Sequence, residues 1–173
     1  MAVERPGAVK MRGNPVTLVG PKLEPGQPAP DFRVVANDLS PVTLKDTRGA
    51  VRIFASVPSL DTSVCDLEGR RFNEEASRLD GVNVYVISMD LPFAQRRWCG
   101  AAGIERVKTL SDHREASFGT AYGVLIKDLR LLARAVFVVD RNDRITYVEY
   151  VPEVTEHPKY EAALEAARRA ARG

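Results

Sequence analysis

Short apolar runs alternate with longer segments in which apolar residues recur at helical spacing. The apolar runs are rich in β-branched and aromatic residues, as strands are. They are "VRIFASV" (51–57), "GVNVYVISMD" (81–90), "RAVFVVD" (134–140) and "RITYVEYV" (144–151). Because the central runs are apolar on both sides, we expect their strands to lie in a sheet that helices cover. The last two runs are separated by Arg141-Asn142-Asp143, which predicts a hairpin.

Helix-start signals stand between these strands. Thr62 can cap a helix running to about Leu79, and Pro92 suits the first turn of a helix through about Ala102. We expect Ser111 to cap a third helix reaching Tyr122. Pro158 opens a C-terminal helix, which ends in arginines as the helix dipole favours.

The first fifty residues predict smaller β elements. Gly13-Asn14-Pro15 indicates a turn between two short strands, which gives an N-terminal β-hairpin. "PKLEPGQPAPDF" (21–32) is Pro-rich and predicts an extended connection, and "DFRVVANDLSPVTLKD" (31–46) predicts two short strands around a turn. Together the elements predict an α/β fold of thioredoxin type, with a central β-sheet flanked by helices, in a single domain covering 1–173.

Composition narrows the function classes. The 173 residues are 45% hydrophobic and 28% charged, with a net charge of +2, which predicts a globular protein and no nucleic-acid partner. No apolar run is long enough for a membrane span or for a secretory leader, so we expect a cytoplasmic protein. Two cysteines do not make a disulfide scaffold, and cytosolic pairs that oxidise are usually catalytic or redox-sensing.

Cys65 stands in the first turn of the helix that Thr62 is expected to cap. Unpaired backbone N–H groups and the positive end of the helix dipole favour thiolate over thiol there. A structural interpretation remains open, because Cys65, Phe72 and Ala76 share one apolar face and a buried cysteine behaves as a small hydrophobe. Taken in isolation, Thr62 is better explained as a plain N-cap and Pro58 as a plain turn residue.

A second chemical signal is the arginine of "LLARAVFVV". Arg134 lies in an apolar strand or at its open end, and a charge in such a place needs a partner or a route to water. Arg52 in "VRIFASV" is a similar case, which we expect to extend its charged end to solvent from the start of its strand.

These residues carry a family resemblance. "PSLDTSVC" resembles the peroxiredoxin motif P-x-x-x-T-x-x-C through Pro58, Thr62 and Cys65. "LPFAQRRWCG" is similar to the segment that holds the second cysteine in the thiol peroxidase subfamily, and "LARAVFVVD" is similar to the strand with its active-site arginine. "GNPVTL" and "KYEAAL" also fit, so the resemblance covers about 10–170.

The resemblance implies a thiol-dependent peroxidase of the atypical two-cysteine type. Cys65 would be the peroxidatic cysteine, with Thr62 and Arg134 as its activating partners and Pro58 as the shield of the pocket. Cys99 would be the resolving cysteine, which forms an intrachain disulfide with Cys65. The resemblance further implies alkyl or lipid hydroperoxides and hydrogen peroxide as substrates, thioredoxin as reductant, a homodimer, and no cofactor or metal.

Two positions depart from the family pattern. Ser63 stands where the subfamily often has proline, and Trp98 stands beside Cys99 where phenylalanine is expected. We expect Trp98 to be a half-buried packing residue.

Other functions remain as alternatives. A peroxide sensor would use the same cysteine pair as a signal without turnover. A disulfide oxidoreductase would usually carry C-x-x-C, which the sequence lacks. A metal site is disfavoured because His113 and His157 have no paired ligand spacing, and we expect both at the surface.

Overall fold

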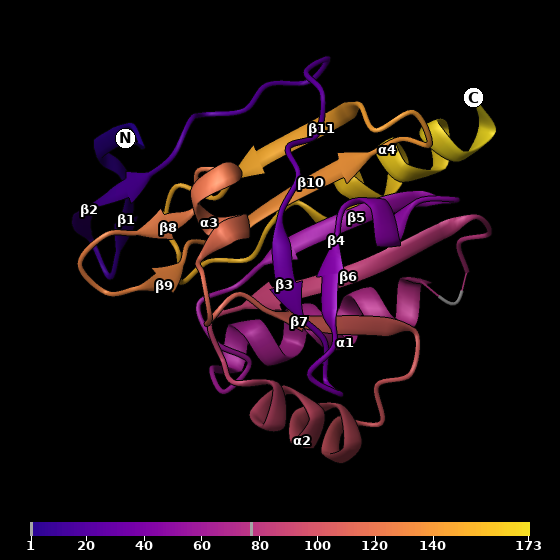
Figure 1. Cartoon of the computed structure of the whole chain (residues 1–173), viewed down its shortest axis with the longest axis horizontal. Helices are drawn as coiled ribbons and strands as arrows, with labels where there is room; N and C mark the ends of the chain where they lie inside the picture. Colours follow the sequence, from indigo (N-terminus) through magenta and orange to yellow (C-terminus); the bar gives the residue numbers. More distant parts are fainter. Residues whose placement is uncertain (1, 77) are drawn as a thin grey trace.

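A seven-stranded mixed sheet forms the centre of the computed structural model, which describes residues 2–76 and 78–173 (Figure 1). The strand order is β11-β10-β5-β6-β7-β3-β4. The strands are β3 (Arg33–Val35), β4 (Pro41–Thr43), β5 (Val51–Ser56), β6 (Val82–Ser88), β7 (Val107–Ser111), β10 (Ala135–Val139) and β11 (Ile145–Tyr150). β5, β6 and β7 run parallel, whereas β10 pairs antiparallel with both β5 and β11. The predicted strands and the final hairpin are confirmed.

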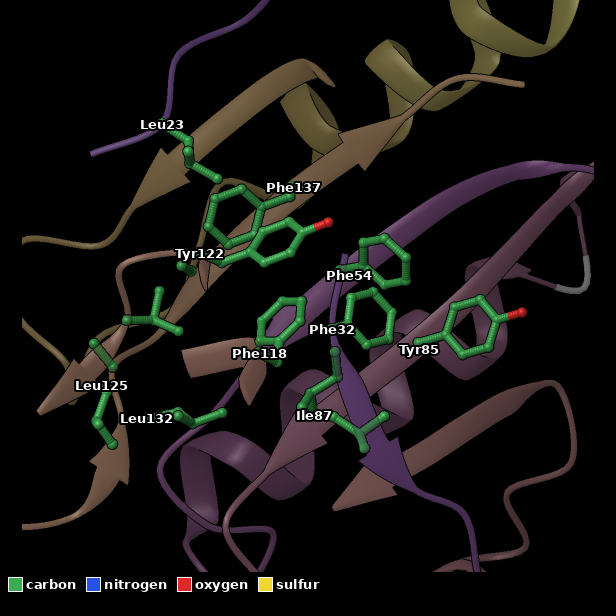
Figure 2. Close-up of a cluster of buried hydrophobic side chains, with 14 of the residues drawn as sticks. Leu23, Phe32, Phe54, Tyr85, Ile87, Phe118, Tyr122, Leu125, Leu132 and Phe137 are labelled. Carbon is green, nitrogen blue, oxygen red and sulfur yellow. The ribbon is translucent and has the colours of Figure 1, made fainter. Parts of the chain in front are cut away.

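Helices cover the sheet. They are α1 (Ser63–Ala76), α2 (Pro92–Ala102), α3 (Ser117–Ala121) and α4 (Tyr160–Arg172), with a short 3-10 helix η1 (Lys45–Thr47). The apolar faces of α1 and α4 pack together on one side of the sheet, in a cluster that includes Cys65, Phe72 and Leu164. The second cluster, on the other side, holds stacked and edge-on aromatic rings, among them Phe54, Phe118 and Tyr122 (Figure 2).

The predicted N-terminal hairpin is present and belongs to a second sheet. β1 (Glu4–Met11) pairs with β2 (Asn14–Val19), and β8 (Leu125–Ile126) and β9 (Leu131–Leu132) extend the sheet in the order β1-β2-β8-β9. The turn lies at Arg12 and Gly13, both with positive φ, so Asn14 and Pro15 already belong to β2. Two consecutive residues with positive φ suit the twist of a two-residue hairpin.

The prediction for Ser111 is wrong. Ser111 ends β7, a strand that the sequence reading missed, and the following helix begins only at Ser117. The carboxylate of Asp112 provides the cap instead, since it accepts the N–H groups of Phe118 and Gly119. The starts of α1 and α2 agree with prediction, whereas α4 begins at Tyr160 and not at the predicted Pro158. α1 ends at Ala76, short of the expected Leu79, and Ser77 lies outside the described residues.

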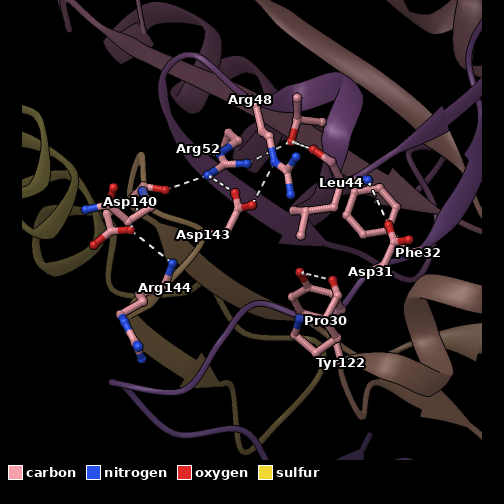
Figure 3. A network of polar contacts seen from close by, with 12 residues as sticks. Pro30, Asp31, Phe32, Leu44, Arg48, Arg52, Tyr122, Asp140, Asp143 and Arg144 are labelled. Atoms are coloured by element: carbon pink, nitrogen blue, oxygen red, sulfur yellow. Dashed lines mark hydrogen bonds and ion pairs between the residues drawn. The ribbon is translucent and has the colours of Figure 1, made fainter.

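Arg52 does not extend to solvent as expected. Its side chain is 0% exposed and forms a 2.8 Å ion pair with Asp143 (Figure 3). It also donates hydrogen bonds to Thr47 Oγ1 and to the carbonyl of Asp140. β5 lies inside the sheet, paired with β10 on one side and β6 on the other, and the buried arginine on it is stabilised by these acceptors instead of by water.

No helix in 2–76 or 78–173 is long and apolar enough to cross a membrane.

Candidate active site

Cys65 lies in the first turn of α1, directly after the turn that leaves β5. The Thr62 hydroxyl accepts the N–H of Cys65 at 3.3 Å, and the Thr62 carbonyl accepts the N–H of Asp66. Thr62 is therefore the N-cap that the sequence predicts. Cys65 is 0% exposed, so its sulfur sits in a dry environment at the positive end of the helix dipole.

Arg134 supplies the charge at this sulfur. Its Nη2 atom lies 3.1 Å from Cys65 Sγ, and its Nε donates to the carbonyl of Val154 at 2.9 Å. Arg134 directly precedes β10, one residue beyond the pair that Ala135 forms with Ser56. This register places it level with the end of β5, where the chain turns toward α1. The structure thus brings Cys65 and Arg134 together.

A third residue of the site, Glu68, was missed by sequence reasoning. Its Oε1 atom lies 2.9 Å from Arg134 Nη1 in an ion pair, and both side chains are almost fully buried. Its other oxygen, Oε2, has no hydrogen-bond partner in the structure. The sequence did contain one indication of this role: a glutamate three residues after Cys65 lies on the same apolar face of the helix.

Burial dominates the electrostatics of Glu68. It raises the pKa of Glu68 to about 7, against the opposing effect of the Arg134 charge and hydrogen bond. The negative charge of Glu149 adds a smaller contribution in the same direction. The charge of Glu68 also affects Tyr160 on α4. Burial raises the pKa of the Tyr160 phenol, and the negative charge of Glu68 raises it further. The fraction of Glu68 that is protonated leaves more of the Arg134 charge for the sulfur of Cys65.

Pro58 and Thr62 frame the site. Pro58 is buried in the turn between β5 and α1. Asp90, just after β6, holds that turn because its carboxylate accepts hydrogen bonds from the Ser59 hydroxyl at 2.7 Å and the Leu60 N–H at 2.8 Å. The Thr62 hydroxyl donates to the Ser59 carbonyl, so its proton is directed to the backbone in this conformation. Within the described chain, Arg134 provides the one side-chain hydrogen bond to Cys65 Sγ.

Cys99 has a different hydrogen-bond partner from Cys65. It lies half-buried near the end of α2, where its Sγ atom is 3.5 Å from Thr109 Oγ1 of β7. Thr109 in turn donates to Asn37. Both cysteines are free thiols. Trp98 is half-buried, as expected, and its ring faces α1, whereas Cys99 contacts β7.

The arrangement suits reaction at sulfur. A buried cysteine sulfur has a guanidinium at hydrogen-bond distance and lies at the N–H groups of a helix start. These donors can stabilise negative charge that develops on an oxygen departing when the sulfur attacks a neighbouring oxygen atom. In 2–76 and 78–173 no group of three metal-ligating side chains could hold an ion.

The chain is similar over most of its length to known proteins. The family model described as Redoxin matches residues 24–164. The thiol peroxidase of Halalkalibacterium halodurans is 61% identical over 94% of this chain and 98% of the relative, and that of Bacillus subtilis is 58% identical over 92% and 96%.

Solved structures agree with this result. A peroxiredoxin-like protein from Aquifex aeolicus superimposes with a TM-score of 0.89 at 42% identity, covering 95% of this chain and 97% of the other. A thiol peroxidase from Chromobacterium violaceum superimposes with a TM-score of 0.85 over 93% and 95%, and at 19% identity it supports the fold alone.

Proposed function

The chain belongs to the redoxin family and within it to the thiol peroxidases, and on that premise we propose that Cys65 is its peroxidatic cysteine. The protein is a thiol-dependent peroxidase with a thioredoxin-like fold. The observation that carries the assignment is the 3.1 Å contact between Arg134 Nη2 and Cys65 Sγ at the start of α1.

The first step is attack of the Cys65 thiolate on the terminal oxygen of a hydroperoxide. A sulfur–oxygen bond forms and the oxygen–oxygen bond breaks, so Cys65 becomes a sulfenic acid and the departing alkoxide takes up a proton. Arg134 and the N–H groups of the first turn of α1 stabilise the negative charge as it moves to the departing oxygen. The Thr62 hydroxyl contributes after it turns away from the Ser59 carbonyl. Because Cys65 is fully buried, the turn containing Pro58 must open to admit the peroxide.

The second step uses Cys99 of the same chain. Its thiol attacks the sulfenic sulfur, water leaves, and a Cys65–Cys99 disulfide forms. A disulfide needs Cα atoms within about 7 Å. Cys99 bonds Thr109 and not Cys65 in the reduced fold, so α1, α2 or both must rearrange locally. Exchange with the dithiol of reduced thioredoxin then restores both thiols and leaves oxidised thioredoxin.

The remaining features of the proposal follow from the family. Alkyl or lipid hydroperoxides and hydrogen peroxide are the substrates, the enzyme works as a homodimer in the cytoplasm, and residues 1–173 act as one domain. No metal or organic cofactor takes part, because the redox chemistry is completed by two cysteines and an external dithiol.

Steady-state turnover tests the proposal. Purified protein with thioredoxin, thioredoxin reductase and NADPH should consume NADPH continuously when hydrogen peroxide or cumene hydroperoxide is added. The second candidate, a peroxide sensor, shares the same buried thiol beside Arg134 and would oxidise once without continuous consumption. Substantial turnover by Cys65→Ser would place the chemistry elsewhere.

A further inference from the structure

The residues next to the two cysteines are bonded to each other. Asp66 follows Cys65 on α1, and Trp98 precedes Cys99 on α2. The indole Nε1 of Trp98 donates to Asp66 Oδ1 at 2.6 Å. We call this contact the clasp, since it joins the helix of one cysteine to the helix of the other.

The packing of the clasp depends on a missing side chain. Gly69 lies one turn after Asp66 and is buried. A Cβ atom added there would stand 2.5 Å from Cη2 of Trp98, closer than a real Cβ approaches another heavy atom. The large ring therefore lies directly against the backbone of α1. Phenylalanine, expected at this position from the resemblance, has no N–H group to donate.

Charge strengthens the clasp. Partial burial opposes ionisation of Asp66, but the hydrogen bonds from Arg70 and Trp98 outweigh it and hold the pKa of Asp66 below its ordinary value. The acceptor is therefore a carboxylate near neutral pH, and hydrogen bonds to charged groups are about twice as strong as neutral ones. Arg70 binds the other oxygen, Oδ2, at 2.9 Å.

Further contacts tie α1 to the end of α2. Arg70 Nη1 donates to the carbonyl of Ala102 at 3.5 Å, and Asn73 Oδ1 accepts the N–H of Arg106 at 2.7 Å. These residues are further along the chain from the cysteines, whereas the two residues of the clasp adjoin them. The clasp is thus the tie that most directly fixes the direction of the residues around Cys99.

Orientation links the clasp to chemistry. Successive residues of an α-helix point about 100° apart. When Trp98 is held against α1, Cys99 points in another direction, and its sulfur lies at Thr109 of β7. Cys99 can reach the Cys65 sulfenic acid only after this part of α2 turns or unwinds, which breaks the bond between Trp98 and Asp66.

We propose that opening of the clasp limits the rate at which Cys99 forms the disulfide with Cys65. The inference rests on the proposed function, because it concerns the second step of that reaction. Trp98 and Asp66 act as positioning residues and contact neither the peroxide nor the reacting sulfur. A slow second step leaves the sulfenic acid exposed to a second peroxide, so the clasp also sets how readily Cys65 is over-oxidised to sulfinic acid.

Trp98→Phe tests the proposal with the smallest change, since it keeps an aromatic ring and removes the donor. Disulfide formation should become roughly tenfold faster, as loss of a charge-assisted hydrogen bond allows. The rate of sulfenic acid formation should be unchanged, and the peroxide concentration needed for sulfinic acid should rise. Quenched-flow alkylation followed by intact-mass analysis measures all three quantities, and it does not depend on the fluorescence of the single tryptophan.

Gly69→Ala is the independent variant. Alanine stabilises a helix relative to glycine, yet its Cβ would displace the Trp98 ring. The proposal therefore expects Gly69→Ala to form the disulfide faster, although the substitution stabilises α1. If unwinding of α1 itself limited the reaction, the same substitution would make disulfide formation slower. In the Trp98→Phe background, Asp66→Asn should change disulfide formation no further, because the bond is already absent.

Glu161→Gln is the matched control. It removes the 3.0 Å ion pair that ties α1 to α4 through Arg71 and leaves α2 untouched. The proposal would be overturned if the rate of disulfide formation were unchanged in Trp98→Phe and Gly69→Ala, or if Glu161→Gln increased that rate equally. Failure of the proposed function is a different result: the unaltered protein would then form no sulfenic acid at Cys65, or no intrachain disulfide.

Discussion

Arg134 Nη2 lies 3.1 Å from the sulfur of Cys65, a residue 69 positions earlier in the chain. The pairing of β10 with β5 produces this contact, since Ala135 is aligned with Ser56 and the chain turns into α1 shortly after Ser56. The antiparallel register therefore determines the chemistry of the thiol. A shift of one residue would direct the guanidinium to the other face of the sheet.

Cys65→Ser should abolish peroxidase activity. A serine hydroxyl is almost unionised near neutral pH and lacks the reactivity of sulfur toward peroxide oxygen. The measurement is NADPH consumption coupled to thioredoxin and its reductase. Thr109→Ser is a suitable control, because it keeps a hydroxyl near Cys99 and leaves Cys65 untouched.

The motif predicted the positions of Pro58, Thr62 and Cys65 correctly because turn, cap and first helical turn depend on neighbouring residues. Arg134 could be singled out as a charge in an apolar segment. Its contact with Cys65 required the register of β10 on β5, which no local pattern contains. Glu68 was missed for the same reason, since a glutamate on a helix is ordinary until its buried partner is known.

The errors have a similar origin. Ser111 has the side chain of a good cap, but pairing of β7 with β6 extends the strand through it and leaves Asp112 to cap α3. Arg52 resembles a surface arginine at the start of a strand, but Asp143 reaches it from the loop between β10 and β11. In both cases a partner distant in sequence determined the outcome.

Arg134→Met should slow sulfenic acid formation by about 10²–10³-fold, the usual loss when one donor to a developing oxyanion is removed. Stopped-flow oxidation monitored by Trp98 fluorescence measures the rate. Arg52→Met is the matched control, because Arg52 is an equally buried arginine whose contacts lie with Thr47, Asp140 and Asp143. If Arg134→Met and the unaltered protein form sulfenic acid at equal rates, Arg134 has only a structural role.

Glu68→Gln should change how stability depends on pH. Burial raises the pKa of Glu68 from 4.5 to about 7, so the folded protein holds a proton that the unfolded chain releases between these values. The stability that this group contributes is full below about pH 4.5 and is lost as pH rises through about 7. Glutamine does not titrate, so the variant should gain up to about 3 kcal/mol relative to the unaltered protein between pH 4.5 and 8.

Urea denaturation of the reduced proteins at several pH values measures this difference. A difference in unfolding free energy that stays constant with pH would show that Glu68 is ionised throughout, with Arg134 compensating its burial fully. Glu75→Gln serves as control, since that carboxylate lies on the same helix and pairs with Arg71 and Arg78, away from Arg134.

Asp143→Asn should destabilise the fold without affecting the chemistry. The substitution leaves the buried Arg52 charge without its ion-pair partner, and asparagine tolerates the positive φ of position 143. We expect a loss of about 3 kcal/mol in the free energy of unfolding. The rate of sulfenic acid formation should be unchanged, and a large fall in that rate would contradict the separation of this network (Figure 3) from the site at Cys65.

Cys99→Ser should react once with peroxide and stop. The Cys65 sulfenic acid then has no thiol within its own chain, so intact-mass analysis should show one added oxygen, and excess peroxide should convert it further to sulfinic acid. The unaltered protein should instead lose the mass of two hydrogens and run as a monomeric chain on a non-reducing gel.

The Cys65–Cys99 disulfide also affects stability. Closing a loop of this length restrains the unfolded chain by roughly 4 kcal/mol. Loss of native helix near Cys65 and Cys99 opposes that gain, so thermal unfolding of the oxidised protein should show little or no increase in stability. A disulfide-linked dimer in place of the intrachain bond would rule out Cys99 of the same chain as the resolving residue.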